Sequence, residues 1–133
     1  KKASVQKIYS GVNTGITNYD IISSKDFTLN NKTGVITFKK TGNYIITAHT
    51  SFLANNPGRK IIWFNCTSRY HPDRIASNET DGIANRLTTS FLGKFEAGDE
   101  INFKVYQKTG FTTNSPNTSQ RFDETQINIR SID

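Results

Sequence analysis

Apolar and polar residues alternate along much of the chain, and turn residues interrupt the alternation at short intervals. The clearest example is the segment 44–52, in which every second residue from Tyr44 to Thr50 falls on one face of an extended chain. A period of two is typical of strands that bury one face in a core. The pattern therefore predicts an all-β fold.

About eight to ten strands are expected. Segment 60–68 carries four large apolar residues in a row, Ile61 to Phe64, which predicts a strand covered on both faces. Segment 83–95 also has helical spacing, but its glycines and threonine pair favour a strand from about Arg86. The expected strands are 5–9, 19–22, 27–29, 35–38, 44–52, 60–68, 86–95, 100–107 and 125–131.

Turn residues separate these strands, and the longest polar segments, 69–81 and 108–121, are expected to be loops. Many short strands with turns between them are typical of a sandwich or jelly roll. The 133 residues fit one compact domain covering 1–133, and no linker, long repeat or low-complexity tract divides them.

Composition agrees with this interpretation. Thr, Ser, Asn, Ile and Phe are abundant, and these residue types favour strands and turns over helices. The single cysteine, Cys66, excludes a disulfide within the chain. It could serve as a nucleophile or an interchain bridge, but a small buried strand residue is the favoured interpretation.

The formal charge of +6 does not indicate a nucleic-acid partner, because the basic residues come in separated pairs with acids between them. No apolar stretch is long enough for a membrane-spanning helix, so no membrane insertion is expected. No signal peptide or initiator Met opens the chain, and we expect a processed or excised fragment.

Three blocks of residues carry a family resemblance. The first is the run Thr33-Gly34-Val35-Ile36-Thr37-Phe38, followed by Gly42-Asn43-Tyr44 and an alternating strand. The second is Leu87, then Phe95-Glu96-Ala97-Gly98-Asp99-Glu100-Ile101, and the third is the closing segment with Ile129 and Ile132. In order and spacing these blocks resemble C1q-like domains, and the resemblance covers nearly the whole chain. Independently, Gly34 and Gly42 fit turns that need positive φ or a close backbone approach.

The resemblance implies a C1q/TNF-like jelly roll of about ten antiparallel strands. It also implies a compact homotrimer that displays loops for recognition, and it allows Ca²⁺ binding as a minor alternative. The collagen-like Gly-X-Y stalk of many members is not in this chain. Composition slightly favours a viral or bacterial type.

Catalytic patterns are poor, and we expect no enzyme. His49 falls within an alternating strand and His71 within a loop, so a structural role is favoured for the first and a solvated position for the second. No serine has a Gly-x-Ser-x-Gly context. Glu79, Asp81 and the Asp99-Glu100 pair are hard oxygen ligands, but no EF-hand spacing is present, so no metal site or cofactor is assigned.

The first functional hypothesis is a trimeric recognition head on a virion or cell surface, binding a receptor, glycan or protein partner. The alternatives are a structural trimerisation cap of a stalk protein and a secreted C1q-like lectin. Loops carry recognition on rigid β scaffolds, and Arg, Tyr and Phe anchor many interfaces. The expected ligand-binding residues of the two long loops are Arg69, Tyr70, His71, Arg74, Phe111, Asn114 and Arg121.

Overall fold

The computed structural model describes residues 7–8, 11–15, 20–21, 25–30, 32–52, 58–82, 86–108, 113–114 and 126–132. These residues form strands and turns, and no helix occurs among them. The strands are β1 (Lys7–Ile8), β2 (Thr14–Gly15), β3 (Asp20–Ile21), β4 (Phe27–Leu29), β5 (Val35–Phe38), β6 (Gly42–Ser51), β7 (Arg59–Thr67), β8 (Arg74–Thr80), β9 (Arg86–Phe95), β10 (Glu100–Lys108), β11 (Thr113–Asn114) and β12 (Gln126–Ser131).

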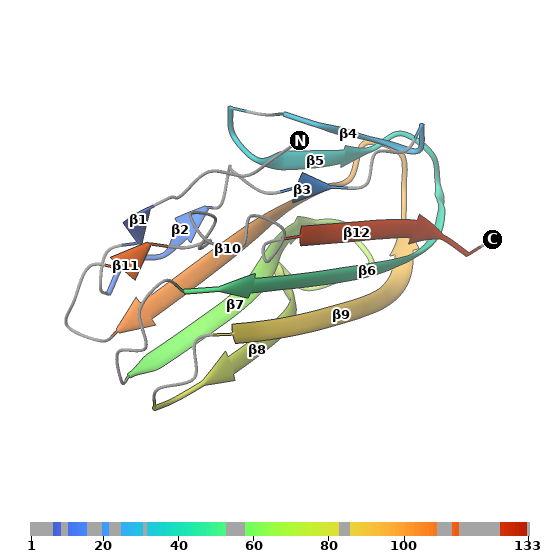
Figure 1. Ribbon diagram of the computed structural model, residues 1–133. Coiled ribbons are helices and arrows are strands. Elements are labelled where there is room, and N and C mark those ends of the chain that lie inside the picture. The colour runs from blue at the N-terminus through green and yellow to red at the C-terminus, as the bar shows by residue number, and fades with distance from the viewer. Residues whose placement is uncertain are drawn as a thin grey trace.

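Two main sheets form the layers of the molecule (Figure 1). One has the order β4-β5-β10-β7-β8, with β2 pairing to β10, and the other has the order β3-β12-β6-β9. A short ladder joins β1 to β11. All pairings are antiparallel except that of β3 with β12, which is parallel. The fold is an all-β jelly-roll sandwich, as the alternation predicted.

The prediction that segment 69–81 is a loop was wrong, because β8 occupies most of it. This strand pairs with β7 at the edge of its sheet and has a bulge near Ala76, whose φ is 55°. Only Ile75 of β8 is buried, so the strand lacks the alternation that reveals a half-buried strand. Strand β11 likewise falls inside the polar segment 108–121.

The core lies between the sheets and follows the period of two. On β6 the buried residues are Tyr44, Ile46, Ala48 and Thr50, and on β10 they are Ile101, Phe103, Val105 and Gln107. Strand β7 is buried at Ile61, Ile62, Trp63 and Phe64, which confirms a strand covered on both faces.

Aromatic rings dominate one end of this core. Phe38 of β5 stacks on Phe95 of β9, with ring centroids 4.4 Å apart and an interplanar angle of 11°. Tyr44 packs against Phe38 at 4.8 Å and donates its hydroxyl to the Lys40 carbonyl at 2.6 Å. The tyrosine therefore fills core volume and still satisfies its polar atom.

Two turns lie at the two ends of β5. Gly34, just before β5, adopts φ of 76°, which confirms the expected positive-φ turn. Gly42 begins β6 as a buried residue and has no positive φ, so for this glycine the close backbone approach stays a prediction. The carboxylate of Asp99 accepts the Glu96 N–H at 2.8 Å and closes the turn between β9 and β10.

Truncating Tyr44 tests this core. We expect Tyr44→Ala to lower the free energy of unfolding by about 3–5 kcal/mol, because a buried ring leaves a cavity. Tyr44→Phe should cost only about 1 kcal/mol, for the lost hydrogen bond to Lys40. Denaturant unfolding measures both, with Thr28→Ala on exposed β4 as the control. A Tyr44→Ala protein as stable as the parent would contradict the core assignment.

Candidate functional site

The seven expected site residues do not form one cluster. Arg69, Tyr70 and His71 lie in the connection between β7 and β8, and Arg74 is the first residue of β8. Asn114 lies in β11, where only its backbone is described. Phe111 and Arg121 lie outside the described residues.

The two long connections leave opposite ends of one ladder. In the β7–β10 pair, Thr67 is opposite Glu100 and Arg59 is opposite Lys108. The connection 68–73 follows Thr67, whereas the segment after Lys108 starts eight residues away, a distance of about 27 Å along a strand. The two connections therefore begin at opposite ends of this ladder.

Tyr70 is the centre of an exposed polar group, which we call the Tyr70 platform and define as Arg69, Tyr70, Lys94 and Glu96. The Tyr70 hydroxyl donates to Glu96 Oε1 at 2.9 Å, and the Arg69 guanidinium donates to the same oxygen at 2.8 Å. Arg69 and Lys94 lie over the tyrosine ring, 5.2 and 5.1 Å from its centroid. The ring is 43% exposed, so an aromatic surface with two cations faces solvent.

The carboxylate of Glu96 holds the platform together electrostatically. The hydrogen bond from Tyr70 lowers the pKa of Glu96 below its ordinary value, and the charge of Arg69 acts in the same direction. In return, the hydrogen bond to Tyr70 and the charge of Glu96 raise the pKa of Arg69. Because these groups are exposed, the ion pair fixes geometry more than it adds stability.

His71 anchors the loop that carries Tyr70, and it is packed rather than solvated as expected. Its Nε2 lies 2.6 Å from the Lys94 carbonyl, which can only accept, so the ring nitrogen donates. The ring packs edge-on against Phe91 at 5.0 Å and against Phe95 at 4.9 Å. Gly93 leaves room for it, since a Cβ at that position would lie 2.9 Å from the ring. His71 therefore positions the platform.

Arg74 belongs to a different place. Its guanidinium lies 4.0 Å over the ring of Trp63, on the face of the β7 sheet that points away from the core. The arginine covers the tryptophan, whose indole N–H donates to Asn65 Oδ1 at 2.8 Å. A covering role of this kind does not require a ligand.

Groups with catalytic or metal-binding potential are few in the described part of the chain. Burial raises the pKa of the Cys66 thiol to about 11, so the thiol stays protonated at neutral pH. His49 lies on β6 beside Gln126, with its Nε2 3.4 Å from the amide oxygen. No group of three or more His, Cys, Asp or Glu in the described ranges is placed to hold a metal ion. Nor do those ranges hold a helix long and apolar enough to cross a membrane.

Lys94 and Glu96 are the platform residues that the sequence did not reveal. They are 24 and 26 positions from Tyr70, and nothing in a charged residue beside a tight turn predicts its distant partner. The packing of His71 on β9 and the hydrogen bonds from Arg69 and Tyr70 to Glu96 join the two segments.

Of the comparisons with known proteins, the one with solved structures gives a match. No family model matches the chain, and no curated protein matches it. Among solved structures, the globular domain of zebrafish complement 1qA protein is similar, with a TM-score of 0.59 and 17% sequence identity. The similarity covers 99% of this chain and 93% of that chain. The chain therefore has a C1q-like fold.

Removing one hydroxyl tests the platform. We expect Tyr70→Phe to raise the pKa of Glu96 toward its ordinary value, because the hydrogen bond from Tyr70 is the largest cause of its depression. A carboxylate with a depressed pKa stabilises the fold above its unfolded pKa and loses that effect as pH falls through the folded pKa. The parent should therefore lose this contribution in acid below the ordinary pKa, and the variant should lose less.

NMR titration of the Glu96 carboxyl carbon measures the shift directly. Tyr106→Phe is the matched control, since that tyrosine lies on β10 and has no hydrogen bond to Glu96. Equal Glu96 pKa values in the parent and in Tyr70→Phe would contradict the geometry of the platform.

Proposed function

We propose that the chain is a single, non-enzymatic recognition domain that works as a homotrimer on a virion or cell surface. In this proposal its loops bind a receptor, a glycan or a protein partner. The observation that carries recognition is the Tyr70 platform, an exposed aromatic ring with two cations beside it, held in place by Glu96 and His71. The similarity to a complement globular domain supports the fold on which such a head would be built.

The platform has the properties of an interface anchor. Tyr and Arg are enriched at the energetic centres of protein interfaces, and a ring already ordered in the free protein loses little entropy on binding. Tyr70 is fixed by its hydroxyl bond and by the backbone that His71 anchors. The side chain of Tyr70 would therefore already be in place before a ligand binds.

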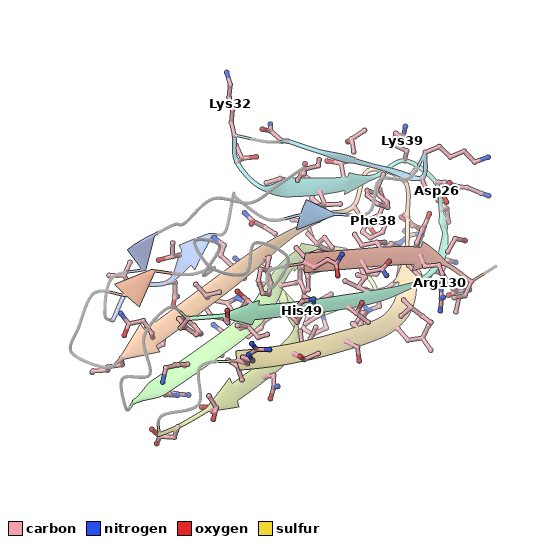
Figure 2. The ribbon with its side chains drawn as sticks, viewed as in Figure 1. Asp26, Lys32, Phe38, Lys39, His49 and Arg130 are labelled. Carbon is pink, nitrogen blue, oxygen red and sulfur yellow. The ribbon has the colours of Figure 1, made fainter. Side chains whose placement is uncertain are left out.

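The outward face of the β3-β12-β6-β9 sheet is the proposed trimer surface. We call it the β6 face and define it by the rows Arg130-Ile45-Leu92, Asn128-Thr47-Ser90 and Gln126-His49-Thr88, which the register places side by side. Leu92 is 62% exposed, and its neighbour Ile45 is half-buried. Figure 2 labels His49 and Arg130 on this sheet. Ile45 and Leu92 form an adjacent apolar pair among polar side chains, which is the arrangement of an interface with an apolar centre and a polar rim.

The alternation of the sequence predicts outward apolar or aromatic residues at Ile45, Ile62 and Tyr106, and the last two have other surroundings than Ile45. Ile62 points into the core and is fully buried, so its inclusion among outward apolar residues was wrong. Tyr106 does point away from the core, but it lies half-buried on β10, in the other sheet.

The mass of the particle tests the trimer. Light scattering at micromolar concentration should give three times the chain mass of 15.0 kDa. Leu92→Asp should reduce the mass to that of one chain, because a carboxylate would be buried without a partner at the interface. Thr28→Asp, on the opposite sheet, should leave the mass unchanged. A parent that stays monomeric at this concentration would contradict the trimer.

Alanine substitution tests recognition once a glycan array or pull-down has identified a ligand. The double variant Arg69→Ala and Tyr70→Ala should weaken binding at least about tenfold, which is about 1.4 kcal/mol. Melting temperature and trimer mass should not change, since both side chains are exposed.

The matched control is Arg59→Ala, which breaks the exposed pair with Glu79 at 2.9 Å away from the platform. A second variant set, at Phe111, Asn114 and Arg121, tests the other loop by itself. Undiminished affinity in both sets would exclude loop recognition and favour the trimerisation cap.

A further inference from the structure

A cavity of about 390 Å³ opens on the outward side of the β5-β10-β7 sheet, which is the sheet opposite to that of the β6 face. Its floor comes from residues 100, 102 and 104 of β10, which alternate with the core residues of that strand. Val35 of β5 and Asn65 and Thr67 of β7 flank this row in register. The backbone carbonyl of Asp73, which accepts the Cys66 N–H at 2.8 Å, fixes one rim.

Asn102 gives the cavity an unsatisfied polar atom. Its Oδ1 is buried, and no donor among the described residues bonds to it. A buried acceptor without a partner is unfavourable, so Asn102 Oδ1 would gain from an incoming donor. The residue pairs with Val35 on one side and Asn65 on the other, and this places the amide in the middle of the cavity row.

Gly15 keeps the space beside this amide open. A Cβ built on Gly15 would lie 3.5 Å from Lys104 Nζ and 3.7 Å from each polar atom of the Asn102 side chain. These are ordinary contact distances, and Gly15 has no positive φ, so its backbone accepts a side chain there. A larger residue would occupy the space in front of the ammonium and the amide.

The polar groups around the cavity form a mixed set. Asn65 accepts the Trp63 N–H through Oδ1, which orients its Nδ2 as a donor. Lys104 adds a second donor, and the carboxylates of Asp73 and Glu100 add acceptors beside Asn102 Oδ1. No ion pair in the described part of the chain involves these three charged residues. A ligand that both donates and accepts hydrogen bonds at several positions would match this set of groups.

Charge and size narrow the ligand class. Two carboxylates against one ammonium leave the lining with a formal charge of −1, which disfavours anions. The volume lies near the small end of ligand pockets, which span roughly 300–1,000 Å³. Each hydroxyl of a sugar both donates and accepts, and the C–H face of its ring can contact the side chain of Val35.

We propose that this cavity is a saccharide site that takes one neutral or amino-substituted sugar ring. Asn102 Oδ1 accepts from a ring hydroxyl, Lys104 and Asn65 donate to others, and Glu100 and Asp73 favour a hydroxyl or ammonium donor over an acidic substituent. The site goes beyond the loop recognition proposed above, since its floor is formed by strands of the β5-β10-β7 sheet and it shares no residue with the Tyr70 platform.

Titration of the ¹⁵N-labelled full chain with single sugars tests the site. Glucose, N-acetylglucosamine and glucosamine are added up to about 20 mM, a range that detects millimolar dissociation constants. At least one should give saturable shifts at the side-chain amides of Asn65 and Asn102. The anionic sugar N-acetylneuraminic acid should give none. Absence of saturable shifts with all three neutral or amino sugars would overturn the proposal.

Gly15 variants provide the second readout. Gly15→Leu should weaken binding at least about tenfold by filling the cavity, whereas Gly15→Ala should fold normally and weaken it less. Ser90→Ala on the β6 face is the matched control and should bind like the parent. Equal affinity in Gly15→Leu would show that the sugar binds elsewhere and would overturn the assignment. Trimer mass and platform binding are measured separately, so failure here leaves those results distinguishable.

Discussion

The stacked rings of Phe38 and Phe95 join the two sheets at the end of the sandwich that carries the Tyr70 platform. Phe38 belongs to the β5 sheet and Phe95 to the β6 sheet, and neither ring is more than 1% exposed. Backbone bonds reinforce the contact, because Phe38 N–H donates to the Asp99 carbonyl and Gly98 N–H to the Phe38 carbonyl. The turn between β9 and β10 is thus fixed to β5 by side chains and by main chain.

The platform depends on this contact in two ways. Glu96 directly follows Phe95, so the position of the stacked ring sets that of the carboxylate. His71 packs on Phe95 from the β7–β8 connection and donates to the Lys94 carbonyl, which sets the position of Tyr70. The exposed Tyr70 platform is therefore ordered by a buried aromatic contact, although its own ion pair is exposed and weak.

The sequence predicted most of the fold because most strands bury one face. Strands β6 and β10 alternate cleanly, and their expected and observed bounds agree within two residues. Strand β8 escaped prediction because an edge strand with one buried residue, Ile75, has no alternation to detect. The order of strands in each sheet was not predicted from periodicity, because pairing partners lie far apart in the chain.

The candidate site was predicted only in part, for the same physical reason. Arg69 and Tyr70 were expected from the residue types that anchor interfaces. Their partners Lys94 and Glu96 are brought to them by tertiary packing alone. The cavity at Asn102 was not predicted from the sequence either. It forms where β2, β5 and β7 pair with β10, and these strands lie far apart in the chain.

The two long central strands explain which surface remains for a second copy. On β7 the outward face is buried at Ile61 and Trp63, where the Arg74 guanidinium lies over the indole ring, and it is exposed at Asn65 and Thr67. On β6 the inward residues are buried together with Ser51, and the outward Ile45, Thr47 and His49 stay half-exposed beside Leu92. A sheet gains stability by burying apolar area on either face. Because Arg74 covers β7 at Trp63, whereas Ile45 and Leu92 leave apolar surface open on the β6 face, contact with another copy would bury apolar surface at the β6 face.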